Sequence, residues 1–445
     1  MRRHGFRTNL TSLGILSKIY ALNYLNPLKS CVLLRLTMRI LYVSQFFPPE
    51  VGAAANRARN FVKFWSKEGA EVTVIAEIPN YPSGRIPNKY LPQRVFRENA
   101  DGKVEVLRVP VLPSPSGGTI LRKIVNNFSF YMNGRTAVSK LLNGKFDIIF
   151  ATAPPFFSTP LGYTLARRYT APLVLDIRDV WPELLLTQEG CNKLCEMLVN
   201  ILAKFMKLYY CYAELIVSPV PYILQYLKKY PISSTYWTPN GVDFQEIDKI
   251  KPANIRKNRF TAIYAGILGR NHGTGTLLKV IEKVRDVEFW VIGDGKDRPL
   301  FEHSNLPNLK YLGIKSWEET ISYIKAADVG IVMLRDNVWM RNAFPVKAID
   351  YLAVGKPVLI SIRSVFAELL RENEAGLSAE SNDVEQFISN LRLLKDNELL
   401  RKRMSKNARK LAEKHFDMSF NASQLLKKLE EIVEKSKRSG RRSSS

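Results

Sequence analysis

Residues 344–358 read FPVKAIDYLAVGKPV, and this stretch decides how the rest of the chain is interpreted. Pro345 suits the first turn of a helix, because the N–H that proline lacks would have no partner there. Gly355 is a typical helix stop, and Pro357 begins PVLIS, which has the character of a buried parallel strand. The stretch therefore predicts a short helix that leads into a strand of an α/β sheet.

Two charged side chains, Lys347 and Asp350, lie three residues apart in this helix and are expected to share one face with Tyr351. A helix start that carries a lysine is an anion site, because free N–H groups, the positive end of the dipole and an ammonium converge there. A carboxylate one turn further on can accept hydrogen bonds from sugar hydroxyls. The alternative is an ordinary amphipathic helix with a solvated Lys–Asp pair.

Apolar runs of strand length alternate with helix-length segments from Met38 onward. The first half contains RILYVS (39–44), EVTVIA (71–76), DIIFAT (147–152), PLVLDI (172–177) and ELIVSP (214–219). After a polar, lysine-rich segment the rhythm begins again, with FTAIYAG (260–266), VEFWVIGDG (287–295) and DVGIVML (328–334) among its strands. The predicted fold class is α/β, with two facing Rossmann-like, doubly wound domains, a cleft between them and a C-terminal crossover helix.

The domain boundaries follow from these runs and from the charge distribution. Residues 1–37 carry Arg and Lys but no acid, so either translation begins at Met38 or a basic extension lies near a membrane. The remaining predicted segments are an N-terminal domain (38–245), a linker (246–258), a C-terminal domain (259–400), helices that dock across both domains (401–435) and a basic, disordered tail (436–445).

The composition narrows the class of partner. The chain has 445 residues and a net charge of +25, which favours anionic partners: nucleic acid, phospholipid or phosphorylated small molecules. The four cysteines form no CxxC pair and the four histidines are scattered, so a metal centre is not expected. No apolar run is long enough to predict a transmembrane helix.

Ligands of doubly wound sheets bind beyond the carboxyl ends of the strands, so the residues there are the candidates for a site. After the first strand, FPPEVGAAANR (47–57) offers Gly52 and small neighbours that let the backbone approach a ligand closely. It is not a GxGxxG motif, so a nicotinamide dinucleotide site has little support. The alternative is a plain tight turn.

Charged residues cluster after the strand at 172–177, where the chain reads DIRDVWPE. Arg178 can hold a phosphate or an acceptor oxygen, and Asp179 or Asp176 can orient a hydroxyl or fix Arg178. The alternative is an ion-pair cluster that caps the sheet and satisfies itself.

Two glycine-rich loops follow strands of the second half. AGILGRNHG (265–273) combines Gly266, Gly269 and Gly273 with Arg270, a combination that suits a diphosphate. Gly293-Asp294-Gly295 forms a turn that can line a nucleotide base or ribose.

The ordered set FFPPEVGAAANR, LDIRDVWPE, TPNGVD, YAGILGR, VIGDG and FPVKAIDYLAVGKPV resembles the glycosyltransferases of family 4, and is similar to the fucosamine-transferase-like subgroup of surface-polysaccharide biosynthesis, lipopolysaccharide included. The resemblance covers residues 38–435 and implies the GT-B fold, with an acceptor domain followed by a nucleotide-sugar domain. It implies a hexosyl- or N-acetylhexosaminyl-type transferase. Such an enzyme moves a sugar from a UDP-linked or other nucleoside diphosphate donor to a lipid-linked or glycan acceptor. It retains the anomeric configuration and needs no cofactor or metal.

The resemblance also implies roles for single residues. The catalytic strand end would hold Arg178, Asp179 and Asp176. Donor binding would fall to Gly52, Gly269, Arg270, Gly293, Asp294, Gly295, Lys347 and Asp350. The family's paired glutamates are replaced by Asn342 and Asp350, and Arg178 stands where many relatives carry a histidine.

An apolar helical stripe suggests contact with a membrane. It consists of Leu194, Leu198, Ile201, Leu202, Phe205, Leu208, Tyr209 and Tyr212. Phe128, Phe130 and Tyr131 beside Arg122 and Lys123 offer a second contact. With the basic charge, this predicts a cytoplasmic protein bound peripherally to the inner face of the plasma membrane. The alternative is a helix buried in the first domain.

Other functions remain open at this point. One is a different nucleotide-sugar enzyme, such as a 2-epimerase, and another is a degraded transferase kept as a partner subunit. A basic nucleic-acid-binding protein is disfavoured, because no recognition motif is present and much of the charge lies near the chain ends.

Overall fold

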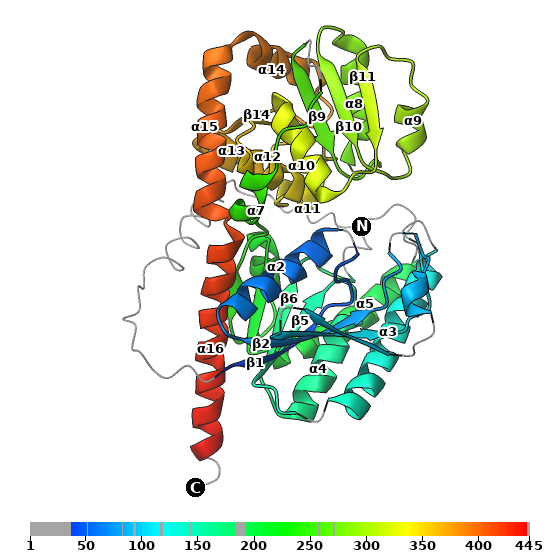
Figure 1. Cartoon of the computed structure of the whole chain (residues 1–445), viewed down its shortest axis with the longest axis vertical. Coiled ribbons are helices and arrows are strands. Elements are labelled where there is room, and N and C mark those ends of the chain that lie inside the picture. The colour runs from blue at the N-terminus through cyan, green and yellow to red at the C-terminus, as the bar shows by residue number, and fades with distance from the viewer. Residues whose placement is uncertain are drawn as a thin grey trace.

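The computed structural model describes residues 37–50, 52–81, 83–91, 95–100, 102–115, 119–142, 144–182, 193–255, 259–269 and 272–442. The predicted basic extension lies outside these ranges, apart from residue 37. Figure 1 shows two α/β domains, one above the other, with α15 (Glu398–His415) beside the upper domain and α16 (Met418–Arg442) beside the lower one. The predicted fold class is confirmed.

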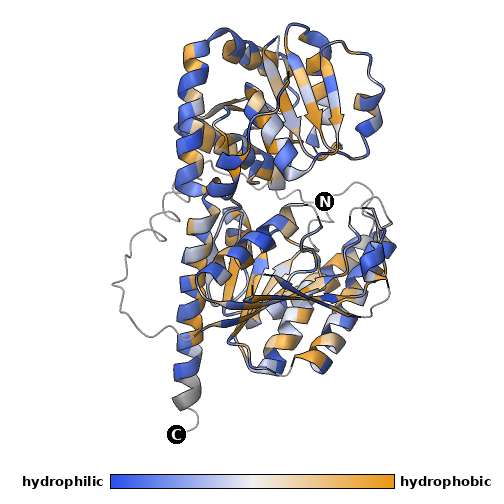
Figure 2. Ribbon diagram, viewed as in Figure 1, coloured by the Kyte–Doolittle hydropathy of each residue, from blue (hydrophilic) through white to orange (hydrophobic). Residues whose placement is uncertain are grey.

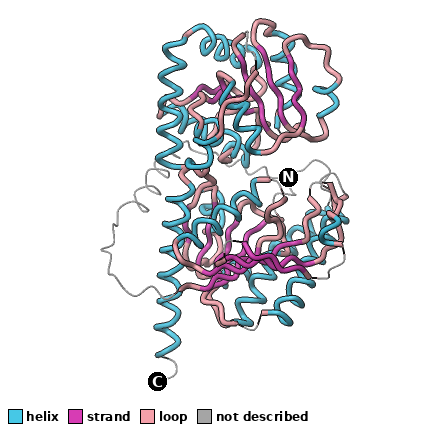
Figure 3. The backbone as a smooth tube through the Cα atoms, viewed as in Figure 1, coloured by secondary structure: helices cyan, strands magenta, loops and turns pink. Residues whose placement is uncertain are grey.

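The N-terminal domain is built on a sheet in the order β3-β4-β2-β1-β5-β6-β7-β8, in which β3 alone pairs antiparallel. Figure 3 shows its strands nearly edge-on, with helices on both sides. The strands are β1 (Arg39–Val43), β2 (Glu71–Glu77), β3 (Phe96–Ala100), β4 (Val104–Val109), β5 (Ile148–Ala153), β6 (Leu173–Ile177), β7 (Leu215–Ser218) and β8 (Thr235–Trp237).

Alternate residues of these strands enter two different cores, as the pleat of a sheet requires. Ile40 and Tyr42 pack with Trp65 of α2 and Leu425 of α16, whereas Leu41 packs with residues on the opposite face. The helices and the single 3-10 turn are α2 (Ala53–Lys67), η1 (Asn88–Tyr90), α3 (Ile120–Leu141), α4 (Ser158–Tyr169), α5 (Lys193–Tyr212), α6 (Pro221–Leu227) and α7 (Phe244–Lys249).

The C-terminal domain has a parallel sheet in the order β11-β10-β9-β12-β13-β14. Its strands are β9 (Thr261–Ala265), β10 (Glu288–Ile292), β11 (Leu309–Gly313), β12 (Val329–Val332), β13 (Val358–Ile360) and β14 (Gly376–Ser378). Its helices before α15 are α8 (Thr274–Lys283), α9 (Arg298–Glu302), α10 (Trp317–Ala326), α11 (Val338–Arg341), α12 (Val346–Ala353), α13 (Val365–Glu372) and α14 (Val384–Asp396).

The stretch from 344 to 358 folds into α12 and β13 as predicted, with one correction. Pro345 caps α12, and Gly355 adopts φ 69° directly after it. Tyr351 does not share a face with Lys347 and Asp350, because its ring is buried against Gly330 and its hydroxyl accepts a hydrogen bond of 2.8 Å from the N–H of Ala265. Tyr351 therefore fixes α12 to β9 and β12.

Two predicted segments differ from the structure. The linker 246–258 begins inside α7, because the Asp243 side chain accepts hydrogen bonds from the first turn and Ile247 is fully buried. The tail predicted to be disordered from 436 continues α16 to Arg442, since lysine and arginine favour helices and Arg438 lies 3.6 Å from Glu434 one turn earlier.

Within the described ranges, no helix combines the length and apolar character needed to cross a bilayer. The stripe predicted on α5 is nevertheless solvent-exposed at Ile201, Leu202, Phe205, Leu208 and Tyr212, so the buried alternative is wrong for these residues. The side chains of Leu194 and Leu198 are not described, and Tyr209 is half-buried. Phe130, named with Phe128 as a second contact, is fully buried instead, because it faces the core beneath α3.

Candidate active site

Lys347 lies over the glycine loop that follows β9. A Cβ placed on Gly266 would stand 2.8 Å from both Cε and Nζ of Lys347, so only glycine leaves room for this side chain. The Lys347 Nζ is buried, makes no hydrogen bond within the described residues, and lies 4.0 Å from the ring centroid of Tyr264. Burial lowers the pKa of Lys347 to about 7. In the described part of the chain, the site thus holds a buried lysine without a counter-ion beside a glycine-rich loop.

The loop after β10 packs directly against the loop after β9. The N–H of Leu268 donates to the Asp294 carbonyl at 2.8 Å, and the N–H of Gly266 donates to the Ile292 carbonyl at 2.9 Å. Gly293 and Gly295 adopt φ 142° and 151°, and a Cβ on either would overlap a carbonyl oxygen of the β9 loop. The glycines predicted to bind donor therefore gather with Lys347 at one edge of the sheet.

Two further predicted donor residues extend this edge. Among the described residues, a Cβ on Gly269 would touch only a methyl of Ile267, at 3.9 Å. The exposed carboxylate of Asp294 lies 3.8 Å from Arg298. Arg270 lies outside the described residues, so the structure says nothing of its place.

A histidine that the sequence did not single out completes this cluster. The Nδ1 of His272 is buried and has no hydrogen-bond partner in the described part of the chain. Burial, with a smaller contribution from the nearby charge of Lys347, lowers the pKa of His272 to about 4. The imidazole is therefore neutral at physiological pH and can donate or accept one hydrogen bond.

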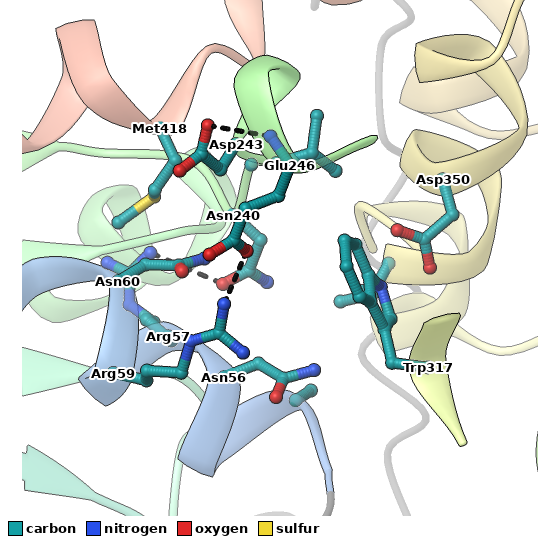
Figure 4. A pocket seen from close by; sticks show the side chains of 14 residues that line it. Asn56, Arg57, Arg59, Asn60, Asn240, Asp243, Glu246, Trp317, Asp350 and Met418 are labelled. Atoms are coloured by element: carbon teal, nitrogen blue, oxygen red, sulfur yellow. Dashed lines mark hydrogen bonds and ion pairs between the residues drawn. The ribbon is translucent and has the colours of Figure 1, made fainter. Parts of the chain in front are cut away.

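Asp350 faces the junction between the domains, not the loop beneath Lys347. It lines a cavity of ≈ 50 Å³ with Trp317 and with residues of α2 and of the segment 240–246. Figure 4 shows Asp350 and Trp317 on one side of this cavity, with Asn56 and Arg59 of α2 on the other. Burial raises the pKa of Asp350 to about 7, against the opposing effect of a hydrogen bond from Trp317.

Asp176, predicted as catalytic, lies in a fully buried ion pair at the end of β6. Its two carboxylate oxygens accept hydrogen bonds from Arg57 at 3.0 and 2.9 Å and from the Thr152 hydroxyl at 2.9 Å. Arg57 also donates to the Pro239 carbonyl at 3.2 Å. The pair thus ties α2 to the segment where the chain leaves the first domain.

Arg178 and Asp179 come directly after the carboxyl end of β6. The Nε of Arg178 donates to the Thr152 hydroxyl at 3.1 Å, and one terminal nitrogen donates to the Pro154 carbonyl. Burial lowers the pKa of Arg178. Asp179 is solvent-accessible, yet the protein around it raises its pKa, with Arg178 opposing the rise. These two side chains are the charged groups immediately beyond the carboxyl end of β6.

Gly52 caps α2 with φ 145°, and a Cβ there would meet nothing within 4 Å. The first turn of α2 lines the junction cavity through Ala53 and Asn56. Gly52 therefore stands at the start of a helix whose first turn lines the junction between the domains.

The structure brings the predicted residues together at two places: the glycine loops with Lys347, and the end of β6. It also shows partners that sequence reasoning missed. Arg57 and Trp317 lie 119 and 33 positions from Asp176 and Asp350, so no local pattern links them. A signal for His272 was available, since it lies within the glycine-rich loop 265–273, three residues after Gly269.

Two protein-family models match this chain, one in each domain. Residues 52–235 match the family "Glycosyl transferase 4-like domain", and residues 245–411 match "Glycosyl transferases group 1". An uncharacterised glycosyltransferase of Methanocaldococcus jannaschii is 27% identical over 156 residues, which is 34% of this chain and 43% of that protein. The chain thus spans less than half the length of this curated relative.

Solved structures share the fold at low identity. Sucrose-phosphate synthase from Thermosynechococcus elongatus superposes with TM-score 0.71 at 15% identity, covering 89% of this chain and 99% of that one. Anabaena HepE in complex with UDP-glucose gives TM-score 0.62 at 16% identity, covering 88% and 100%. Fold and site thus define a two-domain protein of the GT-B type. The two domain matches, in chain order, place it among the family 4-like glycosyltransferases.

Proposed function

We propose that this protein moves a sugar from a nucleoside diphosphate sugar, UDP-linked, to a lipid-linked or glycan acceptor with retention of configuration. The observation that carries the proposal is the buried Nζ of Lys347 beside the glycine loops, which has no partner among the residues that the structure describes. A lone buried ammonium is unfavourable, and a diphosphate bound beside the glycine loops would supply the missing anion. HepE, which shares the fold, was crystallised with UDP-glucose, which supports a nucleotide-sugar donor.

The proposed roles divide between the domains. Lys347 neutralises the leaving diphosphate, and Asp350 accepts hydrogen bonds from the ribose. Arg178 and Asp179 face the acceptor from the first domain. Because such charge stabilisation acts where negative charge develops, it lowers the barrier without a metal ion. We expect turnover, measured as release of UDP, to persist in EDTA; a requirement for added Mg²⁺ or Mn²⁺ would contradict this role of the lysine.

Donor binding is tested with the protein alone. A thermal-shift panel of nucleotide sugars should raise the unfolding temperature, since a ligand at a hundred times its Kd adds about 2.7 kcal/mol. Lys347→Ala should weaken binding and reduce the shift strongly, whereas Lys279→Ala, which changes an exposed lysine on α8 of the same domain, should keep the full shift. Equal shifts of the unfolding temperature in both variants would contradict the proposal that Lys347 binds the diphosphate.

The effect on catalysis should be large. Lys347→Ala is expected to lower turnover at least a hundredfold, roughly 3 kcal/mol of transition-state stabilisation. Release of UDP from the donor is the measurement, and wild-type rates in this variant would refute the proposed chemistry.

The proposed setting is surface-polysaccharide biosynthesis, with the protein held peripherally at the inner face of the plasma membrane. The exposed apolar residues of α3 and α5 support this, because those helices carry seven basic residues and one acidic residue (Arg122, Lys123, Arg135, Lys140, Lys193, Lys204, Lys207; Glu196). Co-sedimentation with phosphatidylglycerol vesicles, but not phosphatidylcholine vesicles, is the expected result.

A further inference from the structure

An aromatic groove of ≈ 270 Å³ lies between α3, α4 and α5. Only the hydroxyls of its tyrosines are polar among the lining side chains, which are Tyr131, Phe156, Phe157, Leu202, Phe205 and Tyr209, with Pro160 at the base. Phe205 and Leu202 are 51% and 36% exposed, so the walls are apolar and face solvent. Large side chains exposed this way mark a surface that something else covers.

Further apolar side chains are exposed on two of the helices that form the groove. They are Ile124, Phe128 and Met132 of α3 and Ile201 and Leu208 of α5, and the Phe128 ring contacts the groove residues Tyr131 and Phe157. Figure 2 shows hydrophobic residues among the outer helices of the lower domain. Basic residues outnumber acidic ones on both α3 and α5. The charge of these helices is therefore complementary to a negatively charged lipid and not to a basic or neutral partner.

The groove also begins beside the proposed catalytic strand ends. Arg178 donates a hydrogen bond to the carbonyl of Pro154, and the groove residues Phe156 and Phe157 follow two and three positions later. Three residues span at most about 11 Å. A molecule that fills the groove can therefore place a head group next to Arg178 without leaving the protein surface.

We propose that this groove binds the isoprenoid chain of a lipid-linked acceptor and directs its diphosphate toward Arg178. The inference rests on the proposed transferase function and selects the lipid-linked acceptor over a free glycan. The lining fits this occupant: aromatic faces suit a branched hydrocarbon, and the exposed apolar surface lets the rest of the chain continue into a bilayer. The head group meets Arg178, which pairs with phosphate oxygens in a planar fork.

The test compares two probes that share a head group. Calorimetry should show farnesyl diphosphate binding the full-length protein at least tenfold more tightly than inorganic diphosphate. Phe205→Ser and Leu202→Ser should each remove most of that difference. Leu208→Ser is the matched control, because Leu208 is 63% exposed on the same helix but does not line the groove, and it should bind farnesyl diphosphate as the wild type does.

Two results would overturn the inference. Equal affinity for both probes would show that the groove does not bind the chain. An equal loss in Leu208→Ser would show that the whole helix face, and not the groove, contacts lipid. The thermal shift by UDP-glucose separates the groove assignment from the proposed transferase function. If UDP-glucose shifts the wild type but the isoprenoid chain adds no affinity, the groove assignment alone fails. If UDP-glucose does not shift the wild type, the transferase function fails.

Discussion

At the scale of single residues, Lys347 makes donor binding depend on pH. Burial sets its pKa near 7 in the free protein, and a bound diphosphate would raise it, so binding above pH 7 requires uptake of a proton. As far as Lys347 is concerned, the Kd for UDP-glucose should not change with pH below pH 7. Above pH 7 the Kd should increase with a slope that approaches tenfold per pH unit. Calorimetry between pH 6 and 9 measures this slope.

The control for that slope is Lys347→Ala. Asp350 also titrates near pH 7, and its carboxylate becomes a better acceptor as the pH rises, so its effect on affinity has the opposite sign. His272 is neutral throughout this range. The variant should therefore lose the upward trend in Kd and keep only the trend of Asp350; an unchanged slope would assign the proton to another group.

Asp176 is a residue whose type was predictable but whose partner was not. The sequence placed it at a strand end in the cleft, whereas the buried Arg57 that pairs with it comes from α2. Asp176→Asn leaves the Arg57 guanidinium buried without its anion, which should lower the free energy of unfolding by about 3–5 kcal/mol. Urea denaturation measures this against Asp294→Asn, a half-exposed control; loss of turnover at full stability would instead favour a catalytic role.

At the scale of elements, the loop between β9 and α8 shows what glycine permits. Gly266→Ala would push its Cβ against Lys347 and would strain a backbone at φ 153°. Among the described residues, the Cβ of Gly269→Ala, three residues on, would touch only a methyl of Ile267. We expect Gly266→Ala to weaken UDP-glucose binding at least tenfold and Gly269→Ala to change it less than threefold. Equal effects would show that the loop backbone, and not the displaced lysine, governs affinity.

The same elements show how much of the structure could be predicted from the sequence. Period and stop signals were enough to predict β9, α12 and β13, because apolar spacing and glycine act locally. Which face of α12 meets the sheet was not decided by spacing, because Lys347, Asp350 and Tyr351 fit one turn equally well. Tyr351 is a core residue because Gly330, which lies in β12, leaves the space that its ring fills.

At the scale of the whole molecule, two segments connect the domains, 238–243 and 416–418, and together they are called the strap here. The chain leaves the first domain through 238–243 and returns through 416–418, and these crossings pair in parallel: Val242 donates to the Phe416 carbonyl at 2.9 Å, and Met418 donates to the Val242 carbonyl at 3.0 Å. The ring of Trp237 packs edge-on against Phe344, with centroids 6.0 Å apart. The strap therefore sets the angle at which donor and acceptor residues face one another.

That geometry separates donor binding from turnover. Lys347, Gly266 and Gly293 all belong to the second domain, so donor affinity should not depend on the strap, whereas transfer needs Arg178 of the first domain in position. Gly241→Ala would press a Cβ onto the Phe416 carbonyl and shift the strap. We expect turnover to fall at least tenfold while the Kd for UDP-glucose changes less than threefold. Gly275→Ala, whose Cβ would meet nothing within 4 Å, is the control and should leave both unchanged. A parallel loss of affinity and turnover in Gly241→Ala would mean that the first domain contributes to the donor site, and the division of labour proposed for the two domains would then be wrong.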